Sequence, residues 1–172
     1  MAVDTYFAYG SNLLLARLRQ DDRAPSAKRI GIAAIDRYSL RFHKVGADGS
    51  GKCDAFGTGV EGDCLHGCLY EIEHEEWTAL DRAEGVGYLR TRLEVRWQGQ
   101  IVAAQTYVAR EHHHDPSLLP FDWYLELVLA GARESGLPEA QIERLEGIRA
   151  TRDPDRARFL RHRALLATLP RG

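Results

Sequence analysis

The order in which strand-like and helix-like segments follow one another constrains this chain more than any other sequence feature. Strand-like patterns dominate the first 109 positions, and the clearest alternation of apolar and polar residues runs from Tyr88 to Trp97. Gln98-Gly99 predicts a tight hairpin into a second strand over 101–109. Helical patterns follow over 121–135, 138–148 and 153–168. Strands followed by helices predict the α+β class rather than alternating βαβ units.

The first 85 residues supply the remaining predicted elements. These are a strand over 3–9, a helix over 13–19, one long or two short strands over 30–45, a central strand over 64–72 and a helix over 74–83. Ser11 or Asn12 is expected to cap the first helix, and Gly85 to end the second. The glycine-rich segment 46–62 is predicted to be a long loop. Hairpin-linked strands of this kind point to a mostly antiparallel, curled sheet or small barrel with helices packed outside.

Length and composition indicate a single domain over residues 1–172. The chain is 44% apolar and 28% charged, with a formal net charge of −2. These values are ordinary for a globular protein and do not indicate binding to nucleic acid or to an anionic membrane. No apolar run approaches the roughly 20 residues that a bilayer requires, and the N-terminus lacks a secretion signal. We therefore expect a cytoplasmic protein that binds neither nucleic acid nor a membrane.

Cysteine and histidine patterns predict no metal site. Three cysteines without an export signal argue against a disulfide framework. Cys64 and Cys68 share one face of the predicted strand, where we interpret them as small buried residues with His66 on the opposite face. The run His112–His114 lies in a predicted extended loop, so its side chains are expected to splay apart into solvent rather than to bind one ion.

The turn Tyr9-Gly10-Ser11-Asn12 is the first candidate for chemistry. A strand that stops at glycine before a helix leaves backbone N–H groups without helical partners, and the helix dipole adds partial positive charge there. Such a turn suits a carboxylate or an oxyanion. Most strand–turn–helix junctions have only a structural role. The segment also lacks the spacing of a phosphate loop and of a nucleophile elbow.

Glu84 is the second candidate, at the predicted end of the helix over 74–83. The negative end of the helix dipole disfavours an ionised carboxylate there, which suits a group that carries protons near neutral pH. A glutamate before a C-cap glycine is, however, usually a solvated surface residue. Asp81 lies one turn earlier, either as a like-charge neighbour or, as we favour, exposed. The spacing of residues in the sequence identifies no nucleophile paired with a base.

Three segments in order resemble the γ-glutamylcyclotransferase family, also called AIG2-like. They are Tyr6-Phe7-Ala8-Tyr9-Gly10-Ser11-Asn12-Leu13; Leu80 to Val86 with Tyr88; and Pro120 to Tyr124 with Gly131 to Pro138. The resemblance extends over about residues 4–150. It implies a small mixed, mostly antiparallel β-barrel flanked by α-helices. It also implies conversion of γ-glutamyl amino acids or γ-glutamylamines to 5-oxoproline without a cofactor.

The resemblance assigns roles to individual residues. Glu84 corresponds to the family's catalytic glutamate, and the backbone N–H groups of Gly10 and Ser11 are the expected donors to the substrate. Substrate binding is implied for Tyr6, Phe7, Ala8, Tyr9, Gly10, Ser11, Asn12, Tyr88 and Tyr124. Asn12 argues against the glutathione-specific branch, which usually has leucine at this position.

Several alternatives stay open at this point. The leaving group can be an amino acid or another amine, and Trp123 with segment 46–62 is expected to shape its pocket. A non-catalytic module that binds a small molecule in the same pocket is a second hypothesis. Nucleic-acid binding by the arginines of the last helix is a third, although arginines beside an apolar face are usually surface residues. A homodimer is neither indicated nor excluded.

Overall fold

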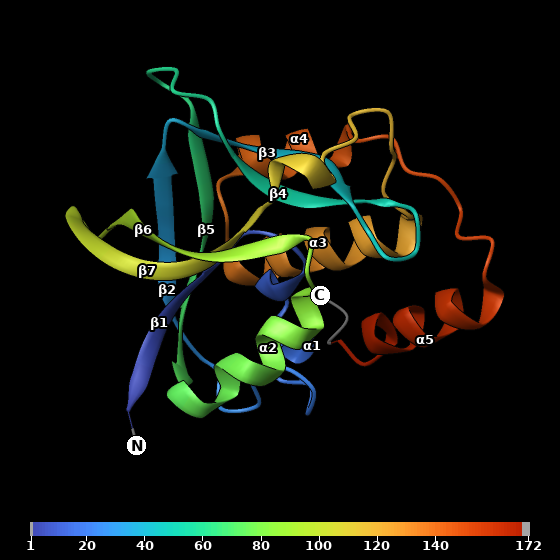
Figure 1. Ribbon diagram of the computed structural model, residues 1–172, viewed down its shortest axis with the longest axis horizontal. Coiled ribbons are helices and arrows are strands. Elements are labelled where there is room, and N and C mark those ends of the chain that lie inside the picture. The colour runs from blue at the N-terminus through green and yellow to red at the C-terminus, as the bar shows by residue number, and fades with distance from the viewer. Residues whose placement is uncertain (1, 170–172) are drawn as a thin grey trace.

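Five strands close into a barrel in the order β1-β5-β2-β6-β7 (Figure 1). The computed structural model describes residues 2–169 of the chain. Its strands are β1 (Val3–Ala8), β2 (Lys28–Asp36), β3 (Tyr38–Val45), β4 (Gly51–Gly57), β5 (Cys64–Glu73), β6 (Tyr88–Trp97) and β7 (Gln100–Ala109). Neighbours in the barrel are antiparallel except β1 and β7, which run parallel. The predicted α+β class and mixed barrel are therefore confirmed.

Strand β5 is the centre of the barrel. It pairs with β1 from Val3↔Glu73 to Ala8↔Cys68, and on its other edge it pairs with β2. Cys68, Leu69 and Tyr70 are consecutive and all buried, so both faces of the strand are covered. The predicted central strand is confirmed, and so is the hairpin of β6 and β7 around Gln98-Gly99.

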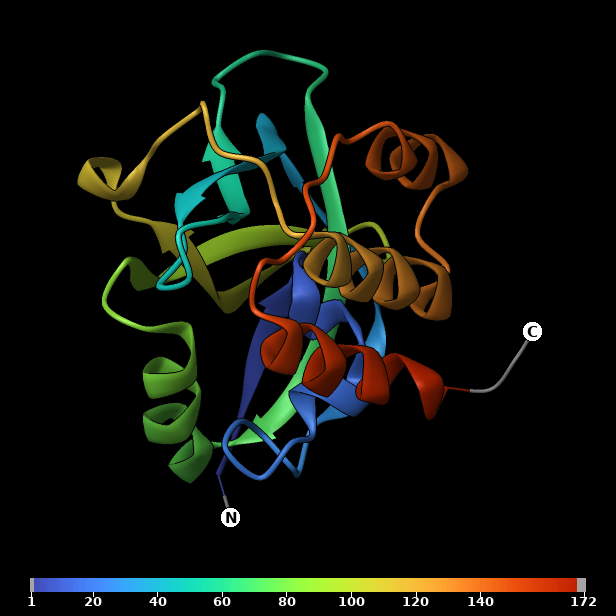
Figure 2. The ribbon, with the colours of Figure 1, turned by 90° about the vertical axis from the view of Figure 1, so that its right-hand side faces the viewer.

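Helices cover the outside of the barrel. They are η1 (Ser11–Leu13), α1 (Leu15–Leu18), η2 (His74–Glu76), α2 (Trp77–Glu84), η3 (Glu111–His113), α3 (Asp122–Ser135), α4 (Glu139–Glu146) and α5 (Arg156–Ala167). Helix α5 lies beside α3 (Figure 2). There His162 stacks on Trp123 with ring centroids 3.7 Å apart, and Arg163 pairs with Glu126. Within residues 2–169, each helix is either too short or too polar to cross a lipid bilayer.

The predicted long loop over 46–62 is wrong in its middle, because β4 occupies Gly51–Gly57 and pairs with β3. This strand was not predicted because the segment is rich in glycine, which has a low β propensity. Tertiary packing overrides that propensity here: Cys53, Asp54 and Ala55 are all buried. A Cβ atom at Gly51 would lie 2.2 Å from the carbonyl oxygen of Phe42, so glycine permits the close approach of the two strands.

The predicted N-cap of the first helix is also wrong. The segment is divided into η1 and α1 by Leu14, whose backbone is extended, and neither Ser11 nor Asn12 caps a helix with its side chain. Ser11 Oγ instead accepts a hydrogen bond from Arg17 Nε at 3.0 Å. Asn12 is buried and its amide points toward other polar side chains. The cap is absent because tertiary hydrogen bonds take both side chains.

The interpretation of Cys64 and His66 requires a correction. Cys68 is buried as expected, but Cys64 is only half-buried. His66 does not lie opposite Cys64: its Nε2 atom lies 3.9 Å from Cys64 Sγ. The physical reason is the period of two in a strand, which places residues 64, 66 and 68 on one face.

A substitution at Gly131 tests how η1 is held against α3. A Cβ atom at this position would lie 2.4 Å from the backbone nitrogen of Leu14 and 2.6 Å from Leu13 Cβ. We expect Gly131→Ala to lower the free energy of unfolding by about 1–3 kcal/mol, because the two backbones must separate. Urea unfolding measures this. Gly147→Ala is the control, since its Cβ would meet nothing closer than 3.5 Å. Equal stability of the two variants would contradict the packing described.

Candidate functional site

The end of helix α2 meets the turn after β1, although 72 positions separate them in the sequence. Gly85 has a φ of 79° and ends the helix directly after Glu84, as the sequence predicted. The Glu84 side chain is 16% exposed. Its Oε1 atom accepts hydrogen bonds from Asn12 Nδ2 at 2.9 Å and from an Arg23 guanidinium nitrogen at 3.0 Å. The carboxylate is therefore held in place from two other segments.

Asn12 is the centre of this network. Its amide nitrogen also donates to the Tyr6 hydroxyl at 2.9 Å, and its amide oxygen accepts from Arg23 at 3.1 Å. Both donors to Glu84 bond Oε1, and within residues 2–169 no side chain or backbone group bonds Oε2. One oxygen of the carboxylate thus fixes its position, while the other remains free to exchange a proton.

A narrow inner pocket of about 20 Å³ lies at this junction. It is lined by Tyr6, Tyr9, Gly10, Ser11, Asn12, Cys53, Glu84, Tyr88, Tyr107 and Tyr124. Seven of the nine residues proposed for substrate binding therefore surround one cavity, together with Glu84. Phe7 and Ala8 do not line it, because their side chains are buried in the barrel core.

Strand β4 supplies a part of this pocket that the sequence did not reveal. The Cys53 backbone N–H donates to the Tyr124 hydroxyl at 3.1 Å, and the Tyr88 hydroxyl donates to the Cys53 carbonyl oxygen. Cys53 lies in the glycine-rich segment that was predicted to be a loop, so no strand period was available to place it. The backbone of Cys53 thus orients both Tyr88 and Tyr124, which come from distant parts of the chain.

Burial determines the protonation of the pocket wall. It raises the pKa values of the Tyr6, Tyr9, Tyr88 and Tyr124 hydroxyls, so these groups stay neutral near pH 7. Burial also raises the pKa of the Cys53 thiol to about 12. A thiol that stays protonated is a poor nucleophile. Among the residues that the structure describes, Glu84 is the only carboxylate that lines this inner pocket.

A brace from the barrel fixes the orientation of α2. Asp81 Oδ1 accepts a hydrogen bond from the Tyr107 hydroxyl at 2.7 Å and lies 3.4 Å from Arg90 Nε. The favoured interpretation of an exposed residue holds only in part: the Asp81 side chain is 42% exposed, but the residue as a whole is half-buried. Its contact with Tyr107 nonetheless ties the last turn of the helix to β7.

An outer pocket of about 460 Å³ adjoins the inner one and shares Ser11, Glu84, Tyr88 and Tyr124 with it. Part of the glycine-rich segment lines it, as expected, through residues 46–48 and Lys52. Trp123 does not line either of these pockets, contrary to expectation. Its ring is buried and its Nε1 atom donates to Asp153 at 2.8 Å.

Cationic side chains of the outer pocket were missed by sequence reasoning. Arg17, Arg23, Lys44, Lys52 and Arg82 all line it. They come from α1, the loop after it, β3, β4 and α2, and of the five only Arg82 lies in a segment that carries the family resemblance. Burial lowers the pKa of Arg17 to about 10, which leaves the guanidinium charged at neutral pH. Only the tertiary fold brings these charges together.

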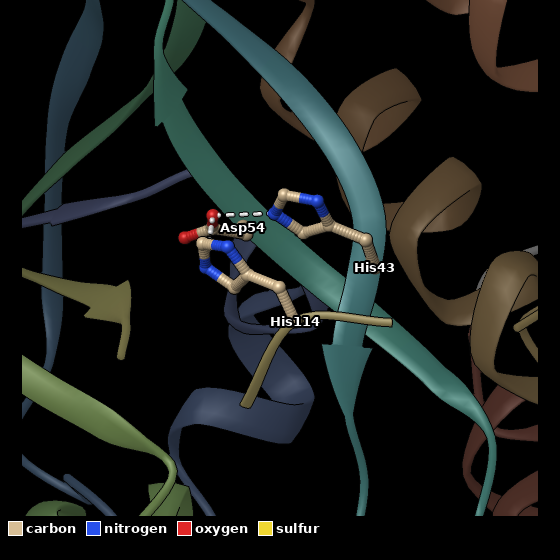
Figure 3. A group of neighbouring side chains, drawn as sticks. All are labelled: His43, Asp54 and His114. Carbon is tan, nitrogen blue, oxygen red and sulfur yellow. Dashed lines mark hydrogen bonds and ion pairs between the residues drawn. The ribbon is translucent and has the colours of Figure 1, made fainter. Parts of the chain in front are cut away.

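A second polar cluster lies behind the pocket and contains His43, Asp54 and His114 (Figure 3). His43 Nε2 bonds Asp54 Oδ2 at 2.8 Å, and His114 Nε2 lies 3.5 Å from the same oxygen. The two imidazole rings stack with centroids 4.1 Å apart. His114 is thus not a solvated loop residue, because the chain turns back and pairs with Lys44 of β3.

These three side chains are of the types that can hold a divalent metal ion, and their donor atoms lie within 4.8 Å of one another. Asp54 is already bonded without an ion, since its Oδ1 atom accepts from the Ala109 N–H at 2.7 Å. The cluster therefore ties β3, β4 and β7 together directly beside Cys53. It supports the pocket wall but does not line the pocket.

The arrangement suits a reaction that needs proton transfer and no enzyme nucleophile. Glu84 stands where the inner and outer pockets meet, with one carboxylate oxygen free. The first N–H groups of a helical turn have no partner within that turn, and Gly10 and Ser11, which begin such a turn, line the inner pocket. N–H groups of this kind can hold a carboxylate or a developing oxyanion, here beside Glu84.

Comparison with known proteins gives consistent matches. The model of the AIG2-like family matches residues 64–145. A human protein named gamma-glutamylcyclotransferase is 29% identical over 154 residues, covering 83% of this chain and 77% of its own. The mouse protein of the same name is also 29% identical, over 153 residues with the same coverage.

Comparison with solved structures gives matches to the same kind of protein. One described as a gamma-glutamyl cyclotransferase has a TM-score of 0.78 and 26% identity, covering 87% of this chain and 90% of its own. A crystal structure of a human protein has a TM-score of 0.76 and 28% identity, covering 88% and 90%.

Asn12 offers a test of the network at the site. Asn12→Leu conserves the size of the side chain, but leaves the Tyr6 hydroxyl, Arg23 and Glu84 each without one hydrogen bond. We expect the free energy of unfolding to fall by about 1–3 kcal/mol, the usual cost of unsatisfied buried polar groups. Urea unfolding measures the change, with the exposed Gln20→Leu as control. The network would be unimportant for stability if both variants unfolded at the same urea concentration.

Proposed function

We infer that this chain is a member of the γ-glutamylcyclotransferase, or AIG2-like, family. We propose that it converts γ-glutamyl compounds to 5-oxoproline and a free amine with Glu84 as the proton carrier. The contact between Glu84 and the Gly10–Asn12 turn is the single observation that carries this proposal. This contact places Glu84 beside the turn whose backbone N–H groups are proposed to bind the substrate, so both can act on one molecule.

Ring closure needs no nucleophile from the enzyme. The α-amine of the substrate attacks its own γ-carbonyl carbon, a new C–N bond forms, and the bond to the leaving nitrogen breaks. The reaction is already intramolecular, so the pocket must mainly hold the bent conformer. Backbone N–H groups of Gly10 and Ser11 are the proposed donors to the substrate carboxylate or to the oxyanion of the tetrahedral intermediate.

Glu84 is proposed to act first as base and then as acid. Its free Oε2 atom accepts a proton from the α-ammonium group, which becomes nucleophilic, and returns that proton to the departing nitrogen. The Arg23 and Asn12 contacts to Oε1 hold the carboxylate still during both transfers. Tyr88 and Tyr124 are proposed to bind the substrate, because both line the inner and the outer pocket.

Replacement of the carboxylate tests the assignment. Glu84→Gln keeps the size of the side chain and a hydrogen-bonding oxygen but removes the proton carrier. We expect the rate of 5-oxoproline release from γ-glutamyl dipeptides to fall at least about 100-fold, with binding of the dipeptide retained in calorimetry.

The control for this experiment is Glu94→Gln, which alters an exposed glutamate on β6. Full activity of Glu84→Gln would remove Glu84 from the mechanism. If the wild-type protein bound γ-glutamyl dipeptides without any turnover, a non-catalytic binding module would replace the proposed enzyme.

A further inference from the structure

The outer pocket carries a surplus of positive charge. Five cationic side chains line it against two carboxylates, those of Asp48 and Glu84. The surplus is three positive charges, whereas the whole chain has a formal net charge of −2. Positive charge is therefore concentrated at this cavity and is not a general property of the surface.

Only part of this charge is neutralised within the pocket. Arg23 pairs with Glu84 at 3.0 Å, and Lys52 pairs with Asp48 at 2.7 Å. Within residues 2–169, Arg17, Lys44 and Arg82 form no ion pair with a carboxylate. Three cations thus remain to interact with a ligand.

Arg17 and Lys44 are the strongest indications of an anionic ligand, because both are buried. Arg17 is 8% exposed, and its Nε atom donates to the neutral Ser11 hydroxyl. Lys44 is 6% exposed, with its ammonium 4.4 Å from the centre of the Tyr88 ring. Glu84 lies near enough to both cations to attract them, but it forms an ion pair with neither. Burial of a charge without a paired opposite charge is unfavourable, so an anion in the cavity would stabilise each group further.

The two pockets differ in size and in charge, and the proposed binding mode places different parts of the substrate in each. The inner pocket, at about 20 Å³, has room for one small polar group of the substrate. The outer pocket, at about 460 Å³, has room for an amino acid or a short peptide beyond Glu84. If the glutamyl end enters the inner pocket, the leaving group meets the cations.

We propose that the outer pocket selects γ-glutamyl substrates whose leaving amine carries two or more carboxylates, such as an acidic amino acid or a short acidic peptide. This inference rests on the proposed function. Alkylamines and polyamines, which bring no negative charge, are disfavoured as leaving groups. The buried lysine and arginine provide the attraction, and the exposed Arg82 adds to it at the entrance.

The test compares two nearly isosteric substrates, γ-glutamyl-glutamate and γ-glutamyl-glutamine. They share every group except one carboxylate, which is an amide in the second compound. We expect kcat/KM to be about tenfold higher for γ-glutamyl-glutamate, as for one additional charged hydrogen bond. The ratio should fall as potassium chloride is added, because salt screens the attraction. Equal values for both substrates, or a preference for the amide, would overturn the inference.

The variant Lys44→Gln tests whether the outer pocket causes the preference for γ-glutamyl-glutamate. We expect the ratio of the two kcat/KM values to fall several-fold in this variant, and to stay unchanged in Lys28→Gln, which alters an exposed lysine on β2. A ratio of two substrates on one variant does not depend on how much of the protein is folded. An unchanged ratio in Lys44→Gln, with Arg82→Gln also unchanged, would contradict the assignment.

Binding measurements test the charge preference even if the proposed catalytic function is wrong. Calorimetry of both dipeptides with Glu84→Gln measures affinity without turnover. If the wild-type enzyme releases no 5-oxoproline from either compound, the proposed function fails, but the affinities still decide the inference. Tighter binding of γ-glutamyl-glutamate would support selection of an anionic group, and equal affinities would refute it.

Discussion

The contact between Glu84 and Asn12 is the interaction on which the rest of the site depends. It joins the last residue of α2 to the turn after β1, and Arg23 bonds both partners. Each of these groups is at least partly buried, so each needs its hydrogen bonds to be stable there. The network therefore sets the geometry of the pocket and holds Glu84, the carboxylate proposed as the proton carrier.

The barrel provides the rigid frame for this contact. Strand β1 is paired on both sides, by β5 and β7, so the turn that follows it starts from a fixed position. Helix α3 packs against η1 at Gly131, and the Tyr107 contact to Asp81 holds α2. The His43–Asp54–His114 cluster supports β4 beside Cys53. These contacts therefore support the pocket walls formed by η1, α2 and β4.

Much of the fold could be predicted from the sequence, because the β6–β7 hairpin and the helices follow clear periods. Strand β4 could not, since its glycines lower β propensity while packing against β3 determines the conformation. At the site, Glu84 and the Gly10 turn were identified from local chemistry and motif. Arg17, Arg23 and Lys44 were not, because an isolated basic residue in a sequence gives no sign of whether folding will bury it beside a cavity.

Glu84 and the Gly10–Ser11 turn are proposed to act on one bound molecule. A crystal structure with 5-oxoproline in the pocket tests this most directly. We expect a Glu84 carboxylate oxygen about 3 Å from the ring nitrogen, within reach for proton transfer, with the product's carboxylate or ring carbonyl on the Gly10 and Ser11 amides. A product bound with its ring nitrogen facing away from Glu84, or bound in another cavity, would contradict it.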